Sequence, residues 1–406
     1  MTSVGLTVSA EAPTETVAEP SVRTDGTTAV GLDGATGAGT GADAGTGERV
    51  RAAAARGSTL LSVQYARGVA AVSVVLFHAF NDAGVTHYPE QVLQSGVDLF
   101  FAISGFIMWV TTCQSSIGPK AFLGKRIRRI VPLYWLFTAI AVAIAVVAPQ
   151  LGKHTGAGDA IASFLFLPAH NPASHAVEPV IAPGWTLNHE MLFYLIFASA
   201  LMFPPKPRLV AVVGINVALV IIGMVTHGPL VVSFYSNPII LEFVFGVIVG
   251  VIYTSGYRAS RRLSWPVVAA GAAVMVAMAA AWGQEVWLRV VLWGLPAAVI
   301  LLALALTENF KPVVRRPRWL FVGDASYSIY IVHGVLLSAL LSIVNHAGVP
   351  KIVMIPIGAP AAVIFGLLVY RYIERPMTNR LRGRRRAPVA IAAPLVRPEV
   401  AGSAEA

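Results

Sequence analysis

The chain has 406 residues, of which 56% are hydrophobic and only 12% are charged, and its mean hydropathy is +0.70. Because soluble domains carry about 25% charged residues, these values exclude an ordinary water-soluble protein. The net charge of +10 would suit a nucleic-acid-binding protein. The basic residues, however, lie in short segments between long apolar runs, a pattern typical of polytopic membrane proteins, and we expect no nucleic-acid partner.

The two ends of the chain differ from its middle. Residues 1–57 are rich in Gly, Ala, Thr and acidic residues and have almost no large apolar side chains. Such a segment cannot bury enough surface to offset the entropy lost on ordering, so we predict a disordered tail. Residues 379–406 are expected to form a second, basic disordered tail, which leaves residues 58–378 as the transmembrane domain.

Ten apolar runs fill that domain, each about as long as a helix that crosses a bilayer. They cover residues 61–80, 93–112, 131–149, 186–203, 208–226, 237–255, 265–282, 287–306, 323–344 and 352–372. Basic residues gather in every second connection, which the positive-inside rule assigns to the cytoplasm. The prediction is an all-α protein with about ten transmembrane helices and both termini cytoplasmic, in the bacterial inner membrane.

The first run holds two ionisable side chains, Arg67 and His78. Eleven helical steps of about 100° bring them to nearly the same face, about 16 Å apart along the axis. Charged groups inside a bilayer are costly and mark functional sites. A lone histidine in a membrane usually packs against a neighbouring helix, but its alignment with Arg67, on the cytoplasmic side, favours a functional role for His78 near the outer surface.

Two carboxylates are expected at a depth similar to that of His78. Asp98 begins the second run and either contacts a substrate or caps its own helix. Glu190 lies about one turn into the fourth run, where we expect it to pair with His78, so that the imidazole can take a hydroxyl proton while the carboxylate stabilises the imidazolium. Beside it, His189 is expected to face solvent, and Trp185 is an interfacial anchor or a substrate contact.

Further candidates lie in later runs. In the ninth run, His333 is expected near the middle of the membrane, where it lines a substrate path or bonds a neighbouring helix, and Tyr330 lies one turn before it. In the sixth run, Glu242 has no evident partner.

A dense basic segment precedes the third run. Arg126 and Arg129 are three residues apart and therefore adjacent on a helix, and such a pair of guanidinium groups suits phosphate. Ordinary positive-inside charge is the alternative. No P-loop, GxSxG, HExxH or CxxC motif occurs, and the single cysteine, Cys113, excludes an internal disulfide. We expect no metal and no bound cofactor.

Six sequence blocks follow one another along the chain. They are Arg67 with His78, GVDLFFAISGF from Gly96 to Phe106, the basic stretch from Arg126 to Tyr134, WTLNHEMLFY from Trp185 to Tyr194, SYSIYIVH from Ser326 to His333, and Glu374-Arg375-Pro376. Together these blocks resemble the acyltransferase-3 family of membrane O-acyltransferases, and their wording is most similar to the exopolysaccharide O-acetyltransferase branch. The family often has a second carboxylate beside its glutamate, whereas Glu190 is the only acid in its block here.

The resemblance implies a membrane O-acyltransferase that uses cytosolic acetyl-CoA, or another acyl-CoA, as co-substrate. Arg126, Arg129 and Arg67 would bind its phosphates. His78 would act as general base with Glu190 as its orienting partner, and Asp98 would lie on the side of the acceptor.

The implied partners are acyl-CoA, a glycan or glycolipid acceptor such as exopolysaccharide, the lipid bilayer and proteins of polysaccharide biosynthesis. The main alternative is a proton-coupled transporter in which Arg67, His78 and Glu190 form a relay. Such a transporter would be expected to have pseudo-symmetric halves, which the sequence does not show.

Overall fold

The computed structural model describes residues 60–85, 90–148, 155–171, 176–226, 228–280, 286–310 and 313–381. The tail predicted for residues 1–57 lies outside them, as does most of the one predicted for residues 379–406, whose first three residues end the last helix. Regular structure in the described ranges is helical and includes no strand, only an isolated bridge between His170 and Val177.

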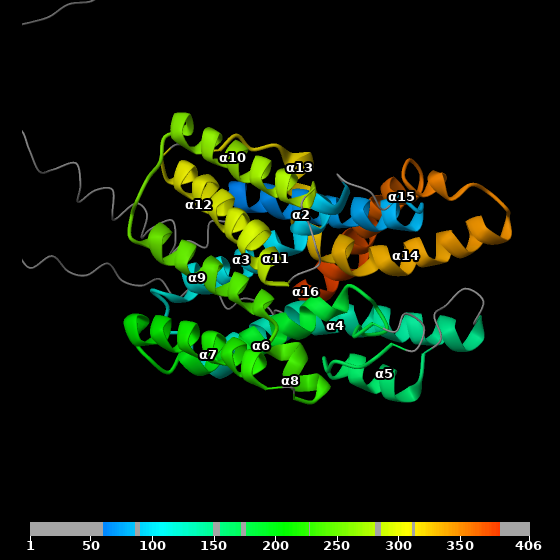
Figure 1. Cartoon of the computed structure of the whole chain (residues 1–406), viewed down its shortest axis with the longest axis horizontal. Coiled ribbons are helices and arrows are strands. Elements are labelled where there is room, and N and C mark those ends of the chain that lie inside the picture. The colour runs from blue at the N-terminus through cyan, green and yellow to red at the C-terminus, as the bar shows by residue number, and fades with distance from the viewer. Residues whose placement is uncertain are drawn as a thin grey trace, which may run out of the picture. The chain divides into compact units, whose positions relative to one another are not determined.

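The chain order of the helices is shown in Figure 1. The longer α-helices are α2 (Leu61–Asp82), α3 (Gly96–Thr112), α4 (Pro119–Val147), α6 (Gly184–Ala200), α7 (Pro205–Val225), α9 (Leu241–Thr254), α10 (Arg261–Ala280), α12 (Leu295–Phe310), α14 (Ser326–His346) and α15 (Gly358–Val369). The shorter elements are η1 (Glu90–Ser95), α5 (Ala157–Phe164), α8 (Leu230–Tyr235), η2 (Pro238–Ile240), α11 (Val286–Arg289), η3 (Val290–Gly294), α13 (Pro317–Asp324), η4 (Lys351–Met354), η5 (Tyr370–Glu374) and α16 (Arg375–Leu381).

Within the described residues, nine helical segments are long and apolar enough to cross a membrane. They coincide with nine of the ten predicted runs, which confirms a multi-pass helical membrane protein. The remaining run, 186–203, corresponds to α6, whose 17 residues would rise about 25 Å, a little less than the hydrocarbon core of about 30 Å. The count of ten spans and the cytoplasmic location of both termini stay predictions.

The basic segment before the third run is helical. Helix α4 begins at Pro119, twelve residues before the predicted start at 131. Proline is favoured in the first turn of a helix, because its missing N–H would have no partner there. Arg126 and Arg129 therefore lie on a helix, where residues three positions apart are neighbours on its surface.

Helices α3 and α9 pack through glycines. A Cβ placed on Gly105 would lie 2.0 Å from the carbonyl oxygen of Phe243, and one placed on Gly246 would lie 1.9 Å from that of Ala102. Only glycine permits this approach, which is a common way to join membrane helices. Helix α3 also contacts α2, α6 and α12.

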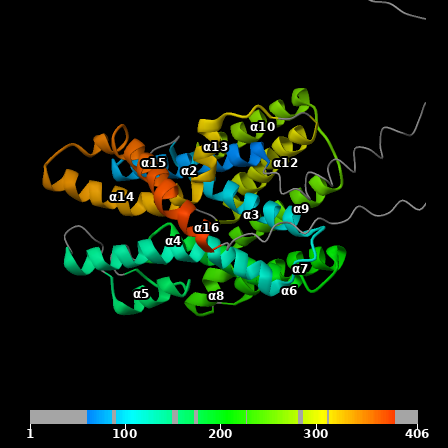
Figure 2. The ribbon, with the colours of Figure 1, turned by 180° about the vertical axis from the view of Figure 1, so that it is seen from behind.

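Two groups of helices flank α3 and α9 in Figures 1 and 2. Helices α4 to α8 lie on one side, and α2 with α10, α12, α14 and α15 lies on the other. Helices α6, α4 and α14 meet across this division, where α4 contacts both of the others. The candidate site lies along this junction.

Candidate functional site

Two cavities lie along the junction, and different residues line them. The first, which we name the arginine cavity, is a narrow space of about 90 Å³ that includes Arg67, Arg126, Arg129 and Glu190 in its wall. The second, which we name the His78 cavity, measures about 530 Å³. Its polar lining residues are His78, Asn81, Asp82, Thr155, Glu178, Ser338, Ser342 and Asn345.

Three arginines from two helices line the arginine cavity, and they are the residues to which the resemblance assigns the phosphates of acyl-CoA. Arg67 of α2 is only 9% exposed, and its Nη1 donates to the side chain of Gln64 at 3.1 Å. The guanidinium of Arg126 lies 5.3 Å from the ring centre of Phe122 and 5.9 Å from that of Tyr194. Its Nε is buried without a hydrogen-bond partner, so the arginines retain a donor for an anion.

Glu190 lies in the arginine cavity and does not meet His78. Its Oε1 accepts hydrogen bonds from Ser104 Oγ, at 2.8 Å, and from the hydroxyl of Tyr194. The carboxylate is thus held at the level of Arg67 and not at that of His78, about 16 Å farther along α2. The predicted depth of Glu190 was wrong, because it assumed that the fourth run starts at the outer surface.

Helix α6 instead starts within the protein, beside the middle of α14. Its N-terminal neighbour Pro183 is buried and lines the His78 cavity, and a Cβ on Gly334 of α14 would lie 3.1 Å from the ring of Pro183. The connection before α6 must therefore descend below the surface, which is consistent with the buried Ile181, 2% exposed. The low start shortens α6 and carries Glu190 deeper.

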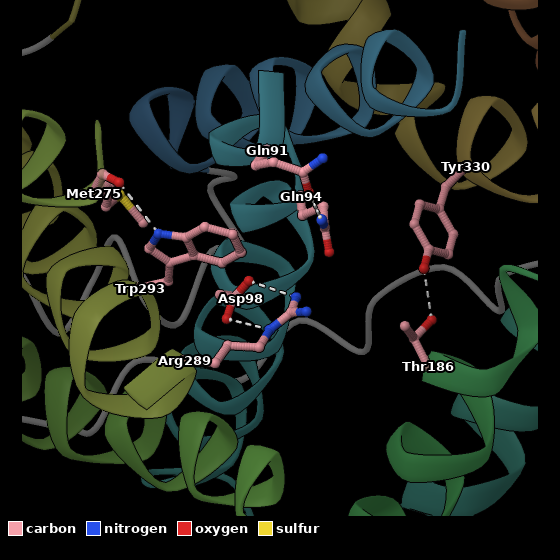
Figure 3. Close-up of polar contacts among 8 residues, drawn as sticks. All are labelled: Gln91, Gln94, Asp98, Thr186, Met275, Arg289, Trp293 and Tyr330. Carbon is pink, nitrogen blue, oxygen red and sulfur yellow. Dashed lines mark hydrogen bonds and ion pairs between the residues drawn. The ribbon is translucent and has the colours of Figure 1, made fainter. Parts of the chain in front are cut away.

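The residues between the two cavities form a partition. Thr186 Oγ1 and the hydroxyl of Tyr330 are 2.9 Å apart and face each other in Figure 3. Both hydroxyls also lie within hydrogen-bond distance of the carbonyl oxygen of Pro183, at 2.9 Å from Thr186 and at 3.3 Å from Tyr330. Because each hydroxyl has one hydrogen, one of them donates to this carbonyl while the other donates to its neighbouring hydroxyl. Thr186 and Tyr330 line the arginine cavity, whereas Pro183 lines the His78 cavity. We name these three residues the partition.

His78 and His333 lie against each other on α2 and α14. Their ring centres are 5.1 Å apart, and His333 is fully buried. His333 lines neither of the two cavities. Its ring bonds its own helix and packs against a neighbouring one, and its place near the middle of the membrane stays a prediction.

Asp98 is paired and buried. It is 0% exposed, and Arg289 donates to its two carboxylate oxygens at 3.1 and 2.9 Å (Figure 3). It lines neither cavity, so nothing in its surroundings offers it to an acceptor. Glu242 is also 0% exposed, and its carboxylate oxygens have no hydrogen-bond partner.

The two remaining predictions in the fourth run have different outcomes. His189 does not face solvent: it is 2% exposed, and its ring nitrogens lie 3.1 Å from the carbonyl oxygens of Trp185 and Phe234. Trp185 is half-buried and packs edge-on against the rings of His189 and Phe101. No contact of Trp185 tests its suggested role in substrate binding.

Sequence reasoning missed three partners of the site residues. The sequence pattern did not indicate Ser104, Thr186 or Arg289 as a partner of any candidate residue. Each is the partner of a polar residue on another helix, so only the packing of the helices reveals it. The signal available for Arg289 was its position inside an apolar run, because a charge there needs a partner. Asp98 and Glu242, in two other runs, are carboxylates that could provide one.

Comparison with known proteins decides the family. A family model described as an acyltransferase domain matches residues 60–371. The chain belongs to the acyltransferase-3 family. This membership makes the protein a membrane acyltransferase and gives no support to the transporter alternative.

Individual relatives agree with this assignment. The exopolysaccharide production protein ExoZ of Rhizobium meliloti (strain 1021) is 38% identical over 331 residues, which cover 77% of this chain and 96% of the relative. The acyltransferase MdmB of Streptomyces mycarofaciens is 24% identical over 333 residues, 73% of this chain and 83% of the relative. No solved structure gives a significant match.

Proposed function

We propose that this acyltransferase-3 protein transfers an acetyl or other short acyl group from cytosolic acyl-CoA to a hydroxyl of an extracytoplasmic glycan. Exopolysaccharide is the acceptor class that we favour, because a relative that the chain matches over 96% of its length is an exopolysaccharide production protein. The observation that carries the proposal is the pair of cavities, one basic and narrow and one wider and lined by an imidazole.

The arginine cavity suits the donor. Phosphates prefer guanidinium groups, and Arg126 has a buried Nε–H without a partner. The space of about 90 Å³ is much smaller than the His78 cavity of about 530 Å³ and is compatible with a thin, extended arm such as that of acyl-CoA. The neighbouring arginines of α4 mark this end as cytoplasmic under the positive-inside rule, in the inner membrane of the cell.

The His78 cavity suits the acceptor. Its volume of about 530 Å³ lies within the range of small-molecule sites, and its polar lining can bond hydroxyl groups. In the proposed reaction the acceptor oxygen attacks the thioester carbonyl while His78 takes the hydroxyl proton. The carbon–sulfur bond then breaks, and the thiolate of CoA leaves and takes up the proton from His78.

Glu190 has a different role in this proposal from the one first expected. The carboxylate lies among Arg67, Arg126 and Arg129 in the arginine cavity, so it orients the guanidinium groups that bind the donor. The position of Asp98, paired with Arg289 and buried, favours a structural role and not contact with the acceptor.

Transfer of label from acetyl-CoA to a purified exopolysaccharide fragment by the full chain tests the proposal. We expect His78→Ala to abolish turnover without loss of expression or folding, and Arg126→Ala with Arg129→Ala to raise the KM for acetyl-CoA. Full activity of His78→Ala would remove the imidazole from the mechanism. An unchanged KM in the arginine variant would leave those residues a role in topology alone.

A further inference from the structure

His333 has an unused nitrogen in the interior of the protein. Its Nδ1 lies 3.2 Å from the carbonyl oxygen of Ile329, one turn earlier on α14. A carbonyl oxygen only accepts, so Nδ1 carries the hydrogen, and in a neutral imidazole Nε2 is then an acceptor. Nε2 is buried and has no hydrogen-bond partner. Because a buried polar atom without a partner is costly, it requires an explanation.

The surroundings of His333 connect the two cavities. On one side its ring packs 5.1 Å from the ring of His78, which lines the His78 cavity. On the other side it lies 5.8 Å from the ring of Tyr330, which lines the arginine cavity and belongs to the partition. A Cβ on Gly334, the next residue of α14, would lie 3.1 Å from the ring of Pro183. His333 is therefore beside the place where donor and acceptor would have to meet.

We propose that His333 is a positioning residue for His78. In the reacting state its Nε2 accepts a hydrogen bond from the ring N–H of His78, which fixes the imidazole of His78 and stabilises the imidazolium that forms when His78 takes the proton of the glycan hydroxyl. This bond is not formed in the present arrangement, where Nε2 has no partner. This inference rests on the proposed function. No proton is transferred to His333: the acceptor O–H bond breaks, a second N–H bond forms on His78, and that proton leaves with the thiolate of CoA.

This role replaces the one first expected of Glu190, which lies in the other cavity. A neutral imidazole suits this role, because it can accept a hydrogen bond from His78 without adding a charge to the membrane interior. The other titratable groups around the pair are Asp82, one turn after His78 on α2, Glu178 of the same cavity wall, and Tyr330. Asp82→Asn is therefore a parallel variant in the test.

Two substitutions separate the nitrogens of His333. In His333→Asn, the amide can still donate to Ile329 from the position of Nδ1, but the acceptor at Nε2 is lost. In His333→Gln, the longer side chain brings an amide oxygen to the neighbourhood of Nε2. Turnover of labelled acetyl-CoA with an exopolysaccharide fragment would be measured against pH for both variants, after confirming that each unfolds near the temperature of the wild type.

We expect His333→Asn to lower kcat by about tenfold or more and to leave the KM for acetyl-CoA within about twofold. Without Nε2 of His333 as hydrogen-bond acceptor, protonated His78 is less stable. The rise of activity with pH, the rising limb of the profile, should therefore occur about one pH unit lower. His333→Gln should restore most of kcat and the limb. A packing role alone would affect both variants alike and leave the pH dependence unchanged, and that result would overturn the proposal, as would a limb that moves only in Asp82→Asn.

A second measurement does not depend on turnover. Diethyl pyrocarbonate modifies unprotonated imidazole, and mass spectrometry of the peptide that contains His78 would follow its rate against pH in the full chain. His333→Asn should move this profile in the same direction as the activity limb. If the wild type transfers no acetyl group, the proposed function fails. If transfer occurs but neither profile moves, the role of His333 is refuted on its own.

Discussion

Removal of the guanidinium of Arg289 should destabilise the helical domain strongly. Asp98 is 0% exposed and accepts two hydrogen bonds from Arg289, at 3.1 and 2.9 Å. Arg289→Met would leave this carboxylate buried without its partner, close to the equally buried Glu242. Breaking a buried ion pair from one side costs about 3–5 kcal/mol, and we expect a loss of that size in the free energy of unfolding.

Unfolding by SDS in mixed micelles, followed by far-UV circular dichroism, would measure this loss. Arg262→Met is the matched control, because Arg262 is exposed and surface changes usually remain within about 0.5 kcal/mol. Asp98→Asn combined with Arg289→Met removes both charges and should recover most of the stability. The reasoning is refuted if Arg289→Met lies within about 1 kcal/mol of the wild type, or if the double variant is no more stable than the single one.

Two further perturbations test the packing and the partition. Gly246→Ala would place a Cβ 1.9 Å from the carbonyl oxygen of Ala102 and should lower the free energy of unfolding by about 3 kcal/mol or more. Gly214→Ala, in open space on α7, is its control and should raise that free energy by about 0.5–1 kcal/mol. Equal effects in the same SDS titration would contradict the close helix contact. Tyr330→Phe removes the hydrogen bond to Thr186 and should raise acceptor-independent hydrolysis of acetyl-CoA about two- to tenfold. A rate equal to that of the wild type would mean that the partition does not shield the thioester from water.

Periodicity within one helix predicted how some of the candidate residues lie relative to one another. Arg67 and His78 lie on α2 at opposite ends of one face, each in a cavity. Arg126 and Arg129 share a face of α4 and meet Arg67. Such predictions succeed because the angle per residue is fixed by the hydrogen bonds of the helix itself.

Contacts between helices could not be predicted in the same way. The predicted pairing of Glu190 with His78 assumed a depth for the start of α6. The hydropathy of the sequence does not indicate that the connection before α6 descends to the buried Pro183. Likewise, Asp98 and Arg289 are 191 positions apart, and only tertiary packing brings them together. The apolar runs indicated the positions of the nine membrane-length helical segments in the described part of the chain, but not the early start of α4 or the relative heights of the helices.

The geometry of the partition has a consequence for the order of the proposed reaction. His78 and the arginines occupy separate cavities, and the hydroxyls of Thr186 and Tyr330 converge on the carbonyl oxygen of Pro183 between them. A thioester held by the arginines can reach His78 only if these hydroxyls part. Tyr330 and His333 lie one turn apart on α14. A shift of that helix would therefore move both residues at once, so that Tyr330 opens the path while His333 moves relative to His78. The donor would then meet an imidazole that is oriented only when the path is open, which would limit the loss of acyl groups to water.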